Sequence, residues 1–236
     1  MITAVYSASR NLYPYMLPSI KSLLDHNEVE TIYLMIEDDE LPYEVPKECK
    51  CINVRGQQIF PPSGVNYRSV FTYMALMRAA YTVVLPKKLD KVLQLDIDTI
   101  VTDDLTELWN TDIKGKWFAA CNEDRGRHRP FGGDKYYNIG VALFNLKQIR
   151  KDHIDGQIVQ ALNTIQMDFL EQDAWNMYGL ANDKIVELPC RYNACFATGE
   201  TDNPAIVHFA GFPDWMRRRS LPGREYLDKY RHLFRE

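Results

Sequence analysis

Lys91-Val92-Leu93-Gln94-Leu95-Asp96-Ile97-Asp98-Thr99-Ile100-Val101 is the stretch from which the fold can be read. Its apolar and β-branched residues predict a buried strand, with two carboxylates placed two positions apart. Alternate side chains of an extended chain share a face, so Asp96 and Asp98 should point one way and Ile97 the other. Two like charges on a buried face repel and are costly to desolvate, and a divalent cation between them would relieve both costs.

An Asp-X-Asp motif is short, and two interpretations of it remain open. In the first, Asp96 and Asp98 hold a metal ion that in turn binds the phosphates of a ligand. In the second, they belong to a solvated turn, and Asp98 caps the element that follows. The motif alone does not decide between a metal site and a turn.

Composition narrows the class of protein. The 236 residues suffice for one large α/β domain, and 28 basic against 32 acidic residues argue against a nucleic-acid partner. No apolar run is long enough to cross a bilayer, and a strand pattern begins directly after Met1, so we expect no leader. The five cysteines are odd in number and scattered, which favours reduced thiols and a cytoplasmic location.

Hydrophobic periodicity predicts an alternation of strands and helices without repeats or linkers, and therefore a single domain over residues 1–236. We expect strands at residues 2–6, 31–36, 51–54, 91–101, 116–121, 136–146, 184–188 and 204–211. We expect helices at residues 15–24, 69–85 and 147–168, and another that follows 171–176.

Polar residues at the ends of these elements are the candidates for a ligand site. The loop Ser7-Ala8-Ser9-Arg10-Asn11 could meet a ligand at a helix N-terminus or simply connect two elements. The acidic run at residues 37–40 is typical of a solvated turn. Arg78 lies in an apolar helix, where it either pairs with a carboxylate or binds a phosphate.

The second half of the chain adds further candidates. Asn138 stands where a strand begins, and Gly140 would let another group approach closely. Residues 171–176 open with three polar acceptors, which is more than helix capping requires. His208 is either a core histidine or a Mn²⁺ ligand beside the two carboxylates. The polar loop at residues 122–134 is a candidate lid.

The tail, residues 215–236, combines a basic cluster at residues 217–219 with an amphipathic helix. One helical face carries Tyr226, Leu227, Tyr230, Leu233 and Phe234. This face could dock on the domain, or it could lie on a membrane surface together with the arginines.

Four motifs in this order resemble glycosyltransferase family 8, which includes bacterial lipopolysaccharide galactosyl- and glucosyltransferases and glycogenin. They are Leu95-Asp96-Ile97-Asp98-Thr99, Tyr137-Asn138-Ile139-Gly140, Gln172-Asp173-Ala174-Trp175-Asn176 and Val207-His208-Phe209-Ala210-Gly211. The resemblance implies the GT-A fold, with a mixed, mostly parallel sheet flanked by helices and a Rossmann-like nucleotide-binding half. It implies that a hexose passes, with retention, from UDP-glucose or UDP-galactose to a glycan, lipid-linked or other hydroxyl acceptor.

The resemblance also assigns roles to residues. The metal, Mn²⁺ or else Mg²⁺, would be held by Asp96, Asp98 and His208. The donor would contact Ser7, Ala8, Ser9, Asn11, Arg78, Asp96, Ile97, Asp98, Asn138 and Gly211. The catalytic residues would be Gln172, Asp173 and Glu171, with Gln172 beneath the anomeric carbon.

Two features depart from the family pattern. Ser9 stands where the family has an acidic residue, and Phe212-Pro213-Asp214-Trp215 lacks the Lys of the family's Lys-Pro-Trp, a charge that Arg217 or a neighbour could replace. Two rival functions stay open, and these departures favour the second of them. One is a metal-dependent phosphohydrolase or nucleotidyltransferase that uses Asp96 and Asp98, and the other is a sugar-nucleotide-binding module without turnover.

Overall fold

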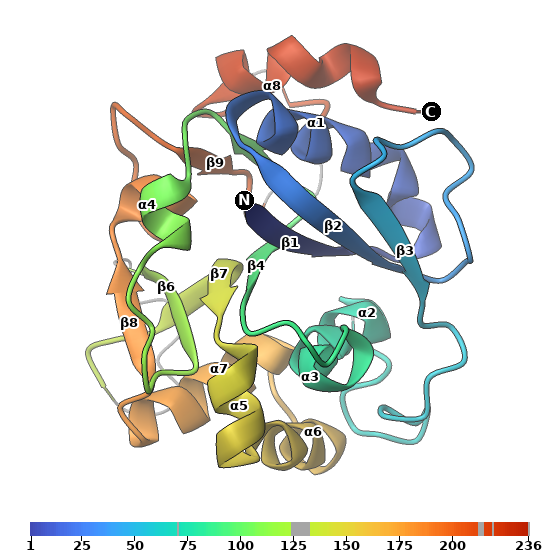
Figure 1. Ribbon diagram of the computed structural model, residues 1–236, viewed down its shortest axis with the longest axis vertical. Coiled ribbons are helices and arrows are strands. Elements are labelled where there is room, and N and C mark those ends of the chain that lie inside the picture. The colour runs from blue at the N-terminus through green and yellow to red at the C-terminus, as the bar shows by residue number, and fades with distance from the viewer. Residues whose placement is uncertain (70, 124–132, 212–214, 219, 236) are drawn as a thin grey trace.

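A seven-stranded sheet forms the centre of the computed structural model, which describes residues 1–69, 71–123, 133–211, 215–218 and 220–235 (Figure 1). The strand order is β3-β2-β1-β4-β7-β6-β8. Every neighbouring pair is parallel except the two pairs that involve β7, so the sheet is mixed and mostly parallel. The strands are β1 Ile2–Ser7, β2 Val29–Ile36, β3 Cys49–Asn53, β4 Val92–Leu95, β6 Phe118–Asn122, β7 Tyr137–Phe144 and β8 Ile185–Leu188.

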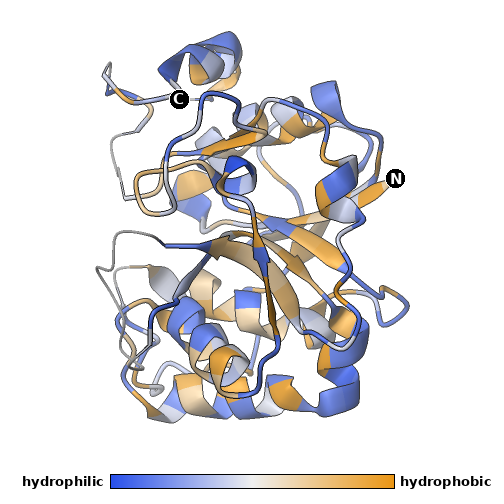
Figure 2. Ribbon diagram, turned by 90° about the vertical axis from the view of Figure 1, so that its left-hand side faces the viewer, coloured by the Kyte–Doolittle hydropathy of each residue, from blue (hydrophilic) through white to orange (hydrophobic). Residues whose placement is uncertain are grey.

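Helices cover both faces of this sheet (Figure 1). One face carries α1 Met16–His26, and the other carries α2 Thr72–Met77, α3 Tyr81–Val84, α5 Leu146–Asp152, α6 Ile154–Thr164 and α7 Leu170–Ala181. Alternate residues of β1 divide between the two cores: Val5 packs with one, whereas Ala4 and Tyr6 pack with the other. Burial on both faces explains why these strands are continuous apolar runs, which Figure 2 shows as hydrophobic ribbons inside more hydrophilic helices.

The strand predicted over residues 91–101 is interrupted at the two carboxylates, where the structure has the turn that the sequence left open as an alternative. β4 ends at Leu95, Asp96–Asp98 form a turn in which Thr99 N–H donates to Asp96 O at 3.2 Å, and the chain leaves the main sheet. β5, Thr99–Val101, pairs instead with β9, Ile206–His208, in a separate two-stranded sheet. In the turn Asp96 and Asp98 both keep partial exposure, which lowers the cost of desolvating two like charges relative to a fully buried strand.

Two expected helices are also interrupted. The helix predicted at residues 69–85 consists of α2, a 3-10 turn at Arg78–Ala80, and α3. The helix predicted at residues 147–168 divides into α5 and α6 at His153, whose backbone is left-handed with φ 52°. Hydrophobic periodicity cannot detect either break, because both flanking segments bury apolar residues on the same side.

The tail docks on the chain itself. α8, Arg224–Tyr230, lies beside α1, and its Leu227 and Tyr230 are buried there. The Phe234 ring packs edge-on against Trp215, and the buried Arg224 guanidinium donates to the carbonyls of residues 215, 216 and 218. Among the described residues, no helix is long and apolar enough to cross a membrane.

Candidate functional site

The three predicted metal ligands meet where β4 ends. The antiparallel register of β5 and β9 places Thr99 opposite His208, and this brings the histidine to the Asp96–Asp98 turn. His208 Nε2 lies 3.3 Å from Asp98 Oδ1 and 3.7 Å from Asp96 Oδ2. One ligand atom from each residue can be chosen so that all three lie within 4.8 Å of one another. Strand pairing, rather than sequence proximity, therefore assembles the cluster.

This cluster fits a divalent cation. Two carboxylates and one imidazole suit Mn²⁺, and less closely Mg²⁺, which prefers oxygen ligands alone. Gly140 of β7 lies directly against the cluster: a Cβ atom there would stand 2.3 Å from His208 Cε1 and 2.8 Å from Asp96 Oδ2. The expected close approach at Gly140 is thus seen, and it is made by the candidate ligands.

Charge around the cluster is dominated by carboxylates. Arg78 donates to Asp96 and to Glu171, and Glu171 is almost completely buried. Three carboxylates against one guanidinium leave a net negative charge when His208 is neutral, which favours a bound cation. Burial raises the pKa of Asp96, partly opposed by Arg78. Burial alone would lower the pKa of His208, but the Asp98 carboxylate raises it well above its usual value.

Gln172 is the partly exposed member of the predicted catalytic trio, since Glu171 and Asp173 are buried. Its Oε1 accepts from the Ile139 N–H at 3.1 Å, and its Nε2 donates to the Tyr136 hydroxyl at 3.1 Å. Asp173 accepts from that same hydroxyl at 2.6 Å. Glu171 and Asp173 therefore orient their neighbours, and Gln172 is the one whose amide can face a ligand.

The first loop starts beside β4, because β1 and β4 are adjacent in the sheet. Ser7 ends β1, Ala8 and Ser9 are buried, and the Ser9 hydroxyl donates to Asn11 Oδ1 at 2.7 Å. The acidic run at residues 37–40 is the expected partly exposed turn, and two of its carboxylates also accept hydrogen bonds from this loop. Arg10 N–H donates to Glu37 Oε2 at 2.7 Å, and Arg10 Nε donates to Asp38 Oδ2 at 2.9 Å.

The remaining predictions lie at the margin of the site. Gly211 is exposed and has a φ of 79°, a conformation that favours glycine. Most of the predicted lid falls in 124–132, and most of the segment that departs from Lys-Pro-Trp falls in 212–214; both ranges lie outside the described residues.

Asn138 contacts two residues that the sequence did not single out. Its Nδ2 donates to Glu123 Oε1 at 3.0 Å, and its Oδ1 accepts from Asn193 Nδ2 at 2.9 Å. Asn193 in turn contacts His208. Glu123 and Asn193 lie in loop-like polar segments, where nothing in the residue pattern separates them from ordinary solvated side chains.

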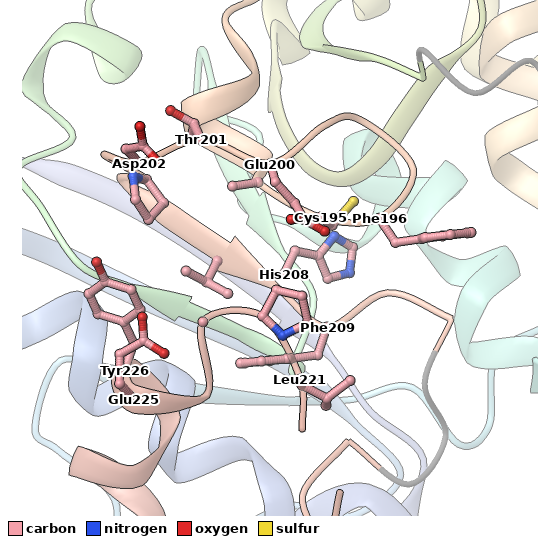
Figure 3. A pocket seen from close by; sticks show the side chains of 15 residues that line it. Cys195, Phe196, Glu200, Thr201, Asp202, His208, Phe209, Leu221, Glu225 and Tyr226 are labelled. Atoms are coloured by element: carbon pink, nitrogen blue, oxygen red, sulfur yellow. The ribbon is translucent and has the colours of Figure 1, made fainter. Parts of the chain in front are cut away.

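A cavity of about 730 Å³ opens beside His208. Figure 3 shows the imidazole and Phe196 toward one side of it, with Asp202 and Tyr226 on another. Its lining combines aromatic rings and carboxylates: Phe196, Phe209, Tyr226, Glu200, Asp202 and Glu225. Flat apolar faces next to hydrogen-bond acceptors suit a polyhydroxylated ligand.

Residues 3–215 match the model of glycosyl transferase family 8. The chain belongs to this family. Among curated relatives, glycosyltransferase GlyA of Streptococcus pneumoniae is 28% identical over 226 residues, which are 87% of this chain and 31% of GlyA. General stress protein A of Bacillus subtilis is 29% identical over 174 residues, 62% of this chain and 59% of that protein. The family 8 chain thus spans only part of the length of these relatives.

Solved structures agree on the fold of this family 8 chain. An active-site mutant of LgtC superposes with a TM-score of 0.76 at 21% identity, covering 97% of this chain and 95% of LgtC. The galactosyltransferase LgtC in complex with donor and acceptor sugar analogues gives a TM-score of 0.74 at 22% identity, covering 100% and 97%. The predicted GT-A fold is confirmed.

Proposed function

We propose that this chain is a retaining, metal-dependent hexosyltransferase whose donor is a nucleoside-diphosphate sugar, UDP-glucose or UDP-galactose. One observation carries the proposal. Consecutive residues of β7 hold the two halves of the site: the Ile139 N–H binds Gln172, and the Gly140 carbonyl accepts from Asp96 N–H at 2.8 Å. The candidate cation cluster and the candidate catalytic amide are therefore fixed to one short piece of backbone.

The chemistry follows from what these side chains can do. A divalent cation held by Asp96, Asp98 and His208 would neutralise the diphosphate leaving group. Arg78 forms ion pairs with Asp96 and Glu171. It would therefore stabilise the negative charge of the leaving diphosphate by its proximity to the metal cluster and not by direct contact. Closure of the site would exclude water, which would otherwise hydrolyse the donor.

An amide is a poor nucleophile, so we favour front-face attack over a covalent intermediate on Gln172. In that mechanism the acceptor hydroxyl attacks the anomeric carbon while its proton passes to the departing phosphate oxygen. Gln172 Oε1, held by the Ile139 N–H, would supply partial negative charge to the developing oxocarbenium. Mass measurement after incubation with donor alone tests this choice, and a glycosylated enzyme would overturn it.

The acceptor would occupy the cavity beside His208. Its carboxylates Glu200, Asp202 and Glu225 disfavour anionic acceptors and favour the hydroxyls of a neutral or amino-bearing glycan, free or lipid-linked. Tyr226→Ala should raise the acceptor KM while leaving hydrolysis of the donor unchanged. An unchanged acceptor KM would place the acceptor elsewhere.

A donor screen tests the function as a whole. Nucleoside diphosphate release is measured over a panel of nucleotide sugars, with Mn²⁺ or Mg²⁺ and with EDTA, together with sugar incorporation into candidate glycans. Release and incorporation should both require the metal. Phosphate or pyrophosphate release without sugar transfer would instead favour a phosphohydrolase or nucleotidyltransferase, and metal-dependent donor binding without release would favour a binding module.

We infer a cytoplasmic location from the cysteines, all of which are free. Membrane contact, if any, would rest on the exposed Arg217 and Arg218, because Leu227 and Tyr230 of the tail are already buried within the chain. Cosedimentation with vesicles that contain or lack anionic lipid tests this contact.

A further inference from the structure

A chain of side-chain amides runs behind the metal cluster. Asn193, at the end of the 3-10 turn Cys190–Asn193, is completely buried. Its Oδ1 lies 2.7 Å from His208 Nδ1, and its Nδ2 donates to Asn138 Oδ1 at 2.9 Å. His208 therefore presents one ring nitrogen to this chain and the other, Nε2, to the aspartates. The orientation of each amide decides where the imidazole proton sits.

The side-chain amide of Asn138 can take only one of its two flipped orientations, because one of its partners can only donate a hydrogen bond and another only accepts. The Gly140 backbone N–H donates to Asn138 Oδ1 at 3.0 Å, and a backbone N–H can only donate. On the other side, Asn138 Nδ2 lies 3.0 Å from the Glu123 carboxylate, which accepts when ionised. A flipped Asn138 would place two donors together at one end and two acceptors at the other.

This constraint passes to the next two groups. Since Asn138 presents an oxygen, Asn193 must present its NH₂ group, and its own oxygen must then face His208. An oxygen facing Nδ1 requires a proton on Nδ1. In the neutral imidazole, Nε2 then carries the lone pair and points at Asp96 and Asp98.

We propose that Asn193 is a positioning residue which, braced by Asn138, selects the Nδ1–H tautomer of His208 and so keeps Nε2 free to bind a divalent cation. The proposal rests on the metal use proposed above. A metal-ligating histidine whose second nitrogen is held by an acceptor is fixed both in ring orientation and in tautomer. The Cys195 thiol also contacts the ring, but a thiol is a weak partner compared with an amide oxygen at 2.7 Å.

The same chain ends at the catalytic amide. Glu123 Oε1, which accepts from Asn138, also accepts from Gln172 Nε2 at 3.4 Å. The Gly140 N–H thus fixes which atoms donate and which accept along a series of hydrogen bonds. In one direction the series runs through Asn138 and Asn193 to His208, and in the other it runs through Glu123 to Gln172. The protonation of the two ring nitrogens of His208 is the consequence of this series that can be measured directly.

The first measurement needs no variant. ¹⁵N-histidine NMR of the wild-type protein, metal-free at high pH and again with Mg²⁺, should show a protonated Nδ1 and an unprotonated Nε2 for His208, assigned by comparison with His208→Gln. A neutral ring protonated at Nε2 would overturn the proposal. This readout does not depend on activity.

The second measurement compares variants by Mn²⁺ titration. Asn193→Leu keeps the number and branching of the side-chain heavy atoms but removes the acceptor, and should weaken Mn²⁺ binding about 10- to 100-fold. Asn193→Asp keeps an oxygen for Nδ1–H but loses the donor to Asn138 Oδ1, so it should bind Mn²⁺ more tightly than the Leu variant and less tightly than the wild type. If packing alone mattered, the two variants would bind Mn²⁺ alike, and that result would contradict the proposal.

Asn66→Leu is the matched control. Asn66 is another buried asparagine, and its Nδ2 donates at 2.7 Å to the carbonyls of Leu162 and Ile165, outside the metal cluster. This variant should lower the thermal midpoint without changing the Mn²⁺ affinity of the folded protein. A wild-type protein that fails to bind Mn²⁺ would count against the proposed function, whereas wild-type binding that Asn193→Leu leaves unchanged would count only against Asn193.

Discussion

Replacing Gly140 with alanine should disable the metal cluster while leaving the fold in place. The added Cβ would lie 2.3 Å from His208 Cε1, whereas non-bonded carbon atoms approach to about 3.5 Å, so about 1.2 Å (3.5 − 2.3) must be gained by movement. Neither partner yields easily. The Gly140 carbonyl accepts from the Asp96 N–H at 2.8 Å, and the His208 side chain is 3% exposed and held by Asn193.

We expect the ring to move, because a side chain can rotate, whereas β7 pairs with β4 from Val141 to Phe144. Metal–ligand distances tolerate only about 0.2 Å, so an imidazole displaced by roughly 1 Å ceases to be a ligand. Overpacking of this kind typically costs about 1–3 kcal/mol of folding stability. We therefore expect Gly140→Ala to fold, with a lower unfolding midpoint, and to bind Mn²⁺ at least about tenfold more weakly than the wild type.

The assay is Mn²⁺ titration by calorimetry or electron paramagnetic resonance, together with urea unfolding. Gly179→Ala is the control: its Cβ would also crowd side chains, at 2.7 Å from Ile185 Cγ1, but it lies in α7 and touches no candidate ligand. It should alter stability and keep the wild-type Mn²⁺ affinity. A folded Gly140→Ala protein with unchanged Mn²⁺ affinity would refute the reasoning, since His208 would then not be a ligand in the geometry described.

Three further predictions concern single side chains. Asp98→Asn should weaken metal-dependent donor binding in calorimetry without unfolding the chain, and unchanged donor affinity in Mn²⁺ would contradict its role as a ligand. Gln172→Ala should slow transfer far more than it weakens donor binding in steady-state and equilibrium measurements, whereas equal losses would make it a binding residue. Hydrogen bonds from Gln148, and with them Trp117 and Lys184, lower the pKa of Asp152 from 3.8 to about 2. Its stabilisation is therefore complete above pH 4 and lost as the pH falls through about 2. Asp152→Asn should cost about 1 kcal/mol at pH 7 after allowance for solvent screening, and urea unfolding should show the difference from wild type shrinking between pH 4 and pH 2.

Buried strands were predictable because they are apolar on both faces. β1, β2 and β7 lie within a few residues of the expected ranges. The breaks at Asp96–Asp98, Arg78 and His153 were not predictable, because periodicity measures which residues are buried and not where the backbone turns. The pairing of β5 with β9 is a contact between segments about a hundred residues apart, on which a local pattern carries no information.

The sequence predicted the candidate metal ligands from their residue types, but it did not predict the residues that surround them. Asp96, Asp98 and His208 are residue types that bind metals, so a sequence can nominate them. The family resemblance nominated Glu171 as a catalytic residue, yet it is buried against Arg78, where it pairs with a guanidinium. A sequence does not show whether an acidic residue is free to bind a ligand or is already paired with a basic side chain.

The side-chain amides of Asn138 and Asn193 belong to a residue type that does not by itself indicate a metal site. An asparagine in a polar loop is most often a solvated or turn-forming residue, and Asn193 differs from one only because folding places it between Asn138 and His208. Its importance arises from the directionality of hydrogen bonds: a single backbone N–H, at Gly140, propagates a donor–acceptor polarity to the imidazole. The same residue must lack a Cβ so that the ring can approach. Gly140 therefore acts on His208 twice, by the space it leaves and by the hydrogen bond it donates, and a proline there would remove the second contribution because proline has no N–H.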